Sequence, residues 1–299
     1  MRMFRKLSLS LAVLLAIAIL MPGCQGSGKK GEKSAKEKTL TMAYVNWAEG
    51  IAMTYLTKAI FEDQGYTVTL KNADVAPVFA ALARGDADVF MDTWLPVTHK
   101  TYMDEYGDKL EVLGTNYKGA RIGLVVPTYV EINSIDQMNG VKDRFNGDIV
   151  GIDAGAGIMK TTDKAIQEYD LDYTLQASSE AAMVASLRRH VKNNEWIVVT
   201  GWAPHYMFAR YDLKFLDDPK GVYGSEEVIK TTATKGFSEK DPYAAKYFAN
   251  FSMTDKQLGD LMGVVADAGN DTEGAVRGWM KKHMDLVNSW LPKKEEMSE

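Results

Sequence analysis

The chain has 299 residues, of which 46% are hydrophobic and 25% are charged. This composition is typical of a globular protein and excludes collagen-like, coiled-coil and wholly disordered chains. A single cysteine excludes a disulfide framework and a cysteine-built zinc site, and the four histidines lack metal-ligand spacing, so we expect no metal and no cofactor. The formal net charge of −5 lacks the basic excess that is usual for proteins that bind nucleic acid.

Residues 1–23 are predicted to be a targeting segment that is not part of the fold. Three basic residues among the first six precede an apolar stretch, Leu9–Met21, which is too short to span a bilayer comfortably. The stretch ends in Met21-Pro22-Gly23-Cys24, which resembles the bacterial lipobox, in which the cysteine is lipidated and becomes the new N-terminus. We therefore expect a lipoprotein signal peptide over residues 1–23 and a lipid anchor on Cys24. The alternative is an ordinary signal peptide with an incidental cysteine.

Residues 24–38 are predicted to be a flexible tether, because they contain no large apolar residue and are rich in glycine, serine and lysine. The folded part then begins near Thr39, and we expect it to be extracytoplasmic and lipid-anchored. Setting aside the basic residues of the first 23 leaves a charge of −8, and setting aside the tether as well leaves about −11.

The first part of the folded chain alternates predicted strands with predicted helices. Alternation of this kind, with helices of this length, indicates a parallel α/β sheet. The elements, in order, are a strand over Leu40–Asn46, a helix over Glu49–Phe61, a strand over Tyr66–Leu70, a helix over Val75–Arg84 and a strand over Ala87–Met91.

The same alternation restarts after about residue 145 and is followed by a helical C-terminal part. The restarted pattern predicts a strand over Asp148–Asp153, helices over Ile158–Tyr169 and Ser178–His190, and a strand over Trp196–Thr200. Helices are then predicted over Asp241–Phe251, Thr254–Ala268 and Thr272–Trp290.

A weak internal repeat links the two α/β units. Gly50-Ile51 and Gly157-Ile158 both follow a predicted strand at the opening of a helix, 107 residues apart. Trp94-Leu95-Pro96 and Trp202-Ala203-Pro204 both follow a later strand, 108 residues apart. Ligands bind at the carboxyl ends of strands in open parallel sheets, and clefts between lobes are preferred positions. The repeat therefore predicts a ligand cleft between two similar units.

Three of the six tryptophans are candidates for ligand binding. Trp47, Trp94 and Trp202 each come directly after a predicted strand, in loops that the topology brings to the same edge. Convergent indole faces suit a quaternary ammonium, which cannot donate hydrogen bonds, and each ring contributes roughly 0.5–2 kcal/mol when the cation is desolvated. The alternative for each tryptophan is core packing.

An anion site is indicated by the loop Asp153–Ile158, which is rich in small residues and exposes the first N–H groups of a helix. It matches no nucleotide-binding motif, and its alternative is a tight turn that needs glycine. His99 is a second candidate to hold a carboxylate, with a surface or capping role as the alternative, whereas His205 is better placed to brace its own loop. The sequence contains no nucleophile elbow and no Ser-His-Asp order, so we do not expect an enzyme.

Four segments together resemble the glycine betaine-binding proteins of ABC transporters: Ala43–Glu49, Asp92–His99, Gly151–Met159 and Thr200–Phe208. The resemblance covers essentially all of residues 39–292. It implies an α/β, type II-like periplasmic-binding-protein fold with two lobes and a ligand cleft between them. Lobe 1 would comprise residues 39–125 and 226–299, and lobe 2 would comprise residues 126–225.

The resemblance also implies roles for individual residues. Trp47, Trp94 and Trp202 would form a prism around a trimethylammonium group. The backbone N–H groups of Gly157 and Ile158, with the side chain of His99, would hold the ligand carboxylate.

The implied function is a lipid-anchored receptor that captures glycine betaine and delivers it to the permease and ATPase of an ABC importer. Receptors of the same fold for choline, carnitine or proline betaine are alternatives within this class. An enzyme that acts on a methylated amine, and a sensory or adhesion module with no transport partner, are alternatives from other classes.

Overall fold

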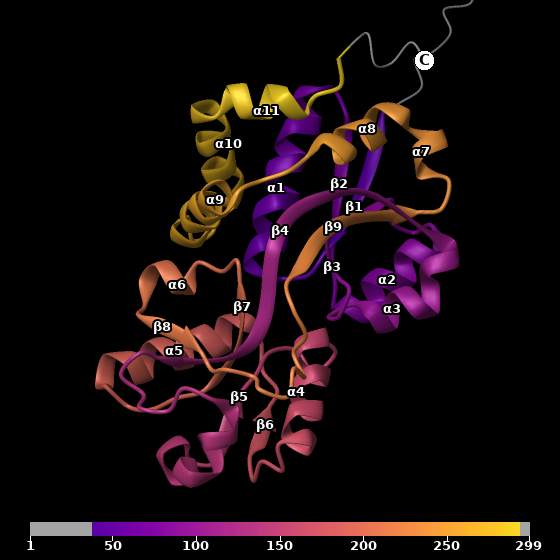
Figure 1. The fold of residues 1–299 in the computed structure, drawn as a ribbon. Helices are drawn as coiled ribbons and strands as arrows, with labels where there is room; N and C mark the ends of the chain where they lie inside the picture. Colours follow the sequence, from indigo (N-terminus) through magenta and orange to yellow (C-terminus); the bar gives the residue numbers. More distant parts are fainter. Residues whose placement is uncertain (1–37, 294–299) are drawn as a thin grey trace, which may run out of the picture. The chain divides into compact units, whose positions relative to one another are not determined.

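The structure is a computed structural model that describes residues 38–293, whose strands join in one mixed sheet flanked by helices (Figure 1). The predicted signal peptide over residues 1–23, Cys24 and all of the predicted tether except Lys38 lie outside the described residues. Within residues 38–293, no helix is long and apolar enough to cross a membrane.

The first set of strands contains three parallel neighbours and one antiparallel strand. β1 lies between β2 and β3 and runs parallel to both, while β9 pairs with β3 in the antiparallel direction. Helix α2 follows β2, buries residues at helical spacing and ends at Gly85, whose φ of 75° suits glycine. The bounds are β1 Thr39–Tyr44, α1 Ala48–Asp63, β2 Thr67–Asn72, α2 Val75–Arg84, β3 Val89–Leu95, α3 Lys100–Tyr106, η1 Gly107–Lys109 and β9 Glu227–Thr234.

Strand β4 (Leu110–Pro127) belongs to both sets of strands, as its long curved path in Figure 1 shows. Its residues up to Ala120 pair with β9, and its residues from Arg121 onward pair with β7 and then β8. All three pairings are antiparallel, so the sheet is mixed, and the predicted parallel arrangement holds for β1, β2 and β3 but not for the strands that join β4. The sheet order is β2-β1-β3-β9-β4-β7-β5-β6, with β8 added beside β4.

The second set of strands repeats the parallel arrangement on a smaller scale. β5 runs parallel to both β6 and β7. The bounds are η2 Ile135–Phe145, β5 Asp148–Val150, α4 Gly157–Glu168, β6 Thr174–Gln176, α5 Glu180–Asn193, β7 Val199–Ala203, α6 Met207–Arg210 and β8 Leu213–Phe215. β4 and the segment 216–226 join this set to the first one. The lobe boundaries proposed from the sequence stay a prediction.

Among the C-terminal helices, α8 packs against β4, while α9 and α10 pack against α1. Side-chain oxygens of Asp241, Thr254 and Asp271 cap the starts of α8, α9 and α10. The helix predicted over Thr272–Trp290 is in fact two helices, because His283 leaves the helical region at φ −125°. The bounds are α7 Phe237–Lys240, α8 Pro242–Asn250, α9 Asp255–Asp267, α10 Thr272–Lys282 and α11 Met284–Trp290.

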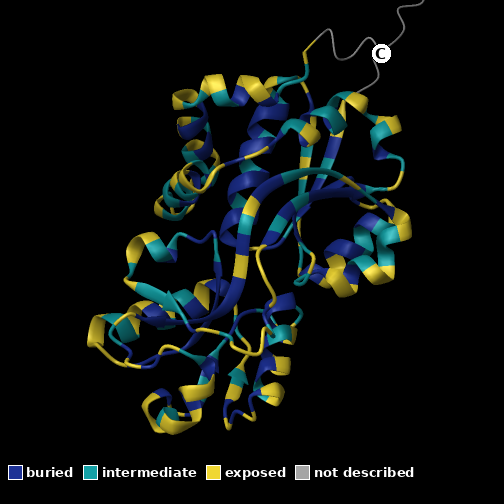
Figure 2. Ribbon diagram, viewed as in Figure 1, coloured by how far each residue is buried: buried dark blue, intermediate teal, exposed yellow. Residues whose placement is uncertain are grey.

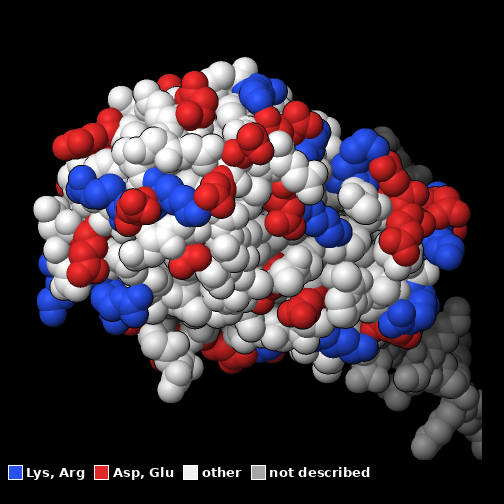
Figure 3. All heavy atoms as spheres, turned by 90° about the horizontal axis from the view of Figure 1, so that it is seen from below, with Lys and Arg blue, Asp and Glu red and all other residues white. Residues whose placement is uncertain are grey.

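Burial follows this layering. In Figure 2 the central strands are mostly buried, whereas the helices expose one side. In Figure 3, acidic and basic side chains are interspersed over the face shown. The acidic excess expected of the folded part is therefore not gathered into one patch on that face.

Candidate ligand-binding site

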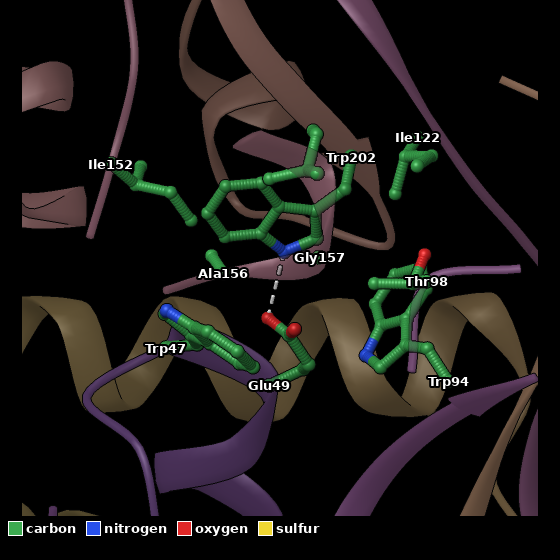
Figure 4. Close-up of a pocket in the computed structure, with 10 residues that line it drawn as sticks. Trp47, Glu49, Trp94, Thr98, Ile122, Ile152, Ala156, Gly157 and Trp202 are labelled. Atoms are coloured by element: carbon green, nitrogen blue, oxygen red, sulfur yellow. Dashed lines mark hydrogen bonds between the residues drawn. The ribbon is translucent and has the colours of Figure 1, made fainter. Parts of the chain in front are cut away.

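A cavity with about 290 Å³ of atom-free space lies between residues of the two sets of strands (Figure 4). Five of the six residues predicted to bind the ligand line it. They are Trp47, Trp94, Gly157, Ile158 and Trp202. The other lining residues are Glu49, Thr98, Ile122, Ile152 and Ala156. The sixth predicted residue, His99, is not among the lining residues.

Two of the three indoles reach the cavity from different backbone positions than we expected. Trp47 precedes α1, as predicted, but Trp94 and Trp202 are the penultimate residues of β3 and β7 rather than loop residues. The predicted strand ended at Met91, before the polar residue Asp92. β3 instead continues to Leu95, and Asp92 is buried within it, where its carboxyl group accepts the indole N–H of Trp94. All three tryptophans are at most 5% exposed.

Each of the three indole N–H groups is already bonded to a carboxylate of the protein. Trp94 Nε1 donates to Asp92 Oδ1 at 2.8 Å and Trp202 Nε1 donates to Glu49 Oε2 at 2.9 Å. Trp47 Nε1 donates to Asp153 at the longer distance of 3.4 Å. Because these donors are engaged, what the rings offer to a ligand is their π faces, and π faces attract cations.

The first residues of α4 form another wall of the cavity. The amides of Met159 and Lys160 turn back to the Ala156 carbonyl, and Gly157 and Ile158 supply the leading N–H groups of the helix. A Cβ on Gly157 would lie 2.1 Å from the backbone oxygen of Thr98, so only glycine allows this approach. The helix start carries partial positive charge and favours a carboxylate.

His99 is fully buried at the N-terminus of α3, where its ring stacks against Trp47 with 5.8 Å between ring centroids. Its Nδ1 accepts the backbone N–H of Trp94 at 2.9 Å, which assigns the ring proton to Nε2. Among the described residues, that Nε2 has no hydrogen-bond partner. Burial, with the nearby Lys160 charge, lowers the pKa of His99 to about 3. His99 is therefore a neutral N–H donor.

Two carboxylates that we did not identify from the sequence fix the loops around the cavity. Glu227 in β9 accepts the backbone N–H groups of Val97 and Thr98 and also the Thr98 hydroxyl. Glu180 in α5 accepts the Ala48 N–H and bonds His205 Nε2. These pairs are separated by 25 to 132 residues in sequence, and no local pattern marks them.

His205 does not line the cavity and, as expected, braces its own loop. Its Nδ1 accepts the backbone N–H of Met207 at 3.0 Å, while Nε2 reaches Glu180 at the same distance. This loop and the loop after Trp94 each contain a cis X–Pro bond, at Ala203-Pro204 and Leu95-Pro96.

Residues 38–282 match the family described as the substrate-binding domain of ABC-type glycine betaine transport systems. The chain belongs to this family. It is 46% identical over 158 residues to the glycine betaine/carnitine transport binding protein GbuC of Listeria monocytogenes, an alignment that covers 52% of each chain. It is 24% identical to the glycine betaine/proline betaine-binding periplasmic protein of Escherichia coli, covering 80% of this chain and 84% of the relative.

Two solved structures resemble this one closely. Lactococcal OpuAC, in its closed-liganded conformation complexed with glycine betaine, is 36% identical with a TM-score of 0.81, and the match covers 86% of this chain and all of that one. The glycine betaine, L-proline-binding protein ProX of Borrelia burgdorferi is 35% identical with a TM-score of 0.83, covering 87% of this chain and 99% of that one. These similarities confirm the family resemblance and the two-lobed α/β fold class. The family is one of transport proteins that bind a substrate.

Proposed function

We propose that this protein captures glycine betaine in the cavity between its lobes, as the receptor of an ABC importer. One observation carries the proposal: three indoles, with their N–H groups engaged, line the same cavity as the start of a helix. The trimethylammonium group would lie against Trp47, Trp94 and Trp202. The carboxylate would accept hydrogen bonds from the amides of Gly157 and Ile158 and from His99 Nε2.

The groups proposed to hold the ligand come from both sets of strands. Trp47 and Trp94 belong to the first set of strands and their helices, and Trp202 and α4 belong to the second. A ligand in the cavity would therefore join both lobes and favour the closed form. A micromolar site corresponds to about −8 kcal/mol, which three ring contacts and two or three hydrogen bonds can supply after ordering costs.

The cellular part of the proposal rests on the sequence and on the family. We propose that Cys24 carries the lipid anchor, that the folded part lies outside the cytoplasmic membrane, and that a permease and an ATPase receive the ligand. Palmitate labelling of the full chain, abolished by Cys24→Ala, tests the anchor.

Ligand identity is tested by thermal shift with betaine, proline betaine, choline, carnitine and trimethylamine N-oxide. We expect betaine and proline betaine to stabilise the protein more than choline, carnitine or trimethylamine N-oxide, because only a short carboxylate beside the cationic head engages both walls of the cavity. Between these two we expect the larger stabilisation from betaine, whose head group is smaller. A choline-binding protein that is 26% identical, with a TM-score of 0.79, makes choline the main competitor. If choline gave a larger shift than betaine, choline would be the ligand, and the proposed site for the cationic head group would still stand.

The indole cage is tested by Trp94→Ala and Trp202→Ala. Each substitution should weaken betaine binding at least about tenfold, because it removes one desolvated cation–π contact and opens the cavity. Trp279→Ala is the matched control, since Trp279 is similarly buried, at 3% exposed, but packs between α9 and α10. The control should lower the melting temperature without changing the dissociation constant from calorimetry. Unchanged affinity in both cage variants would remove the cage.

A further inference from the structure

Two carboxyl groups hold indoles of the cavity through hydrogen bonds to the ring N–H groups. Glu49 bonds the Trp202 ring and itself lines the cavity, and Asp92 bonds the Trp94 ring from within β3. Both residues are 1% exposed. In Figure 4, the Glu49 carboxyl points to the indole nitrogen of Trp202, with Trp47 on one side and Trp94 on the other.

Another acid, and no lysine or arginine ion-pair partner among the described residues, accompanies these two carboxyls. Asp92 Oδ2 has no hydrogen-bond partner among the described residues, and a Cβ on Gly50 would lie only 2.7 Å from it. Glu180 in α5 adds a third negative group, which the Ala48 amide and His205 hold. In the described part of the chain, no ion pair joins Glu49 or Asp92 to a lysine or arginine.

We propose that Glu49 and Asp92 make the cavity selective for a head group with a full positive charge, by fixing two indoles and placing negative charge beside them. The inference rests on the proposed function, since it concerns the same cavity. Buried carboxylates without a counter-ion are unfavourable, and a cation a few ångströms away offsets that cost. A neutral head group of the same shape would gain the packing but not this electrostatic term.

Proton release is a consequence of this arrangement. Burial raises the pKa of Glu49 well above its ordinary value, with Asp92 and Glu180 adding to the effect, and burial raises the pKa of Asp92 to about 7. A cation in the cavity favours the ionised carboxyls, so binding should release part of a proton near pH 7, and affinity should rise with pH. The neighbouring His99 has its pKa lowered to about 3 by burial and takes no part in this range.

The test compares betaine with tert-butylacetate, which has the same shape and carboxylate but a carbon in place of the cationic nitrogen. Calorimetry gives the ratio of their dissociation constants for the wild type, Glu49→Gln and Asp92→Asn. The new amides can still accept the indole N–H, so these variants remove charge and keep a hydrogen bond. We expect the preference for betaine to fall at least about fivefold in each variant.

Asp260→Asn is the matched control, because Asp260 accepts the indole N–H of Trp279 at 2.8 Å away from the cavity. It should leave the ratio unchanged. Titration of the wild type in buffers of different ionisation enthalpy counts protons, and we expect release with betaine, none with tert-butylacetate, and less release in the two cavity variants.

The outcomes separate the two proposals. If the wild type binds no quaternary ammonium, the proposed function fails. If betaine binds but the wild type releases no proton and its affinity does not rise with pH, this inference is overturned, even where a variant does not fold. An unchanged ligand ratio in folded Glu49→Gln and Asp92→Asn would overturn it equally.

Discussion

At the scale of single residues, His99 shows how backbone contacts decide what a side chain can do. The Trp94 amide occupies Nδ1, and burial keeps the ring neutral, so the free Nε2 is a donor over the whole physiological pH range. A charged imidazolium would lose its hold on a carboxylate as pH rises through about 6.5, the ordinary value for histidine. A neutral donor has no such dependence.

The prediction at this scale concerns His99→Ala and two ligands that share a cationic head. The substitution should weaken betaine binding more than choline binding, because only betaine has a carboxylate to accept the Nε2–H. Removing a hydrogen bond to a charged group costs about 1.5–3 kcal/mol, or roughly ten- to a hundredfold in affinity. Calorimetry with both ligands checks this. Equal losses would mean that His99 acts only by packing against Trp47.

At the scale of elements, the close approach of α4 to the loop after β3 depends on one glycine. Gly157→Ala would place a methyl group 2.1 Å from a backbone oxygen, which cannot rotate away as a side chain can. The start of α4 must then shift, and its leading amides move with it.

We expect Gly157→Ala to weaken betaine binding by more than about tenfold, because hydrogen bonds weaken steeply when donors are displaced. Gly155→Ala is the control, since nothing lies within 4 Å of the Cβ it would add. Comparing the dissociation constants of the two variants tests this prediction, and far-ultraviolet circular dichroism monitors their folding. Wild-type affinity in Gly157→Ala would show that α4 tolerates the shift.

Sequence patterns predicted elements whose signals are local and missed those that depend on distant partners. Helix α2 has the predicted bounds, Val75–Arg84, because apolar spacing and Gly85 mark it. Strand β4 was not predicted, because it is defined by β7 and β9, which lie about a hundred residues away in sequence. Likewise, the three tryptophans of the site were identified from the sequence because each follows a predicted strand. The roles of Glu49 and Glu227 were not identified, since their partners are 153 and about 130 residues away in sequence.

At the scale of the whole molecule, side-chain contacts join the two sets of strands beside the cavity. The Tyr102 hydroxyl in α3 donates to the Gly155 carbonyl before α4 at 2.9 Å, and Lys160 lies over the Tyr102 ring. The Ala48 amide and the Trp202 indole add further bonds of this kind. Under the proposed function such contacts must break before the lobes separate, so they should slow release of the ligand.

Tyr102→Phe should therefore raise the dissociation rate roughly two- to tenfold, which corresponds to the net worth of one hydrogen bond. Tyr173→Phe is the control, because its hydroxyl bonds Met138 within the second set of strands. Stopped-flow release of betaine measures both rates. If the two variants release at the same rate, the contact with Gly155 does not hold the lobes together.

The distribution of the indoles has a practical consequence. Trp47, Trp94 and Trp202 face the cavity, while Trp196, Trp279 and Trp290 pack elsewhere. Three of the six tryptophans therefore lie beside the cavity, where an arriving cation alters the electric field around the rings. Occupancy can be followed by ultraviolet fluorescence, without a dye, on the unmodified chain.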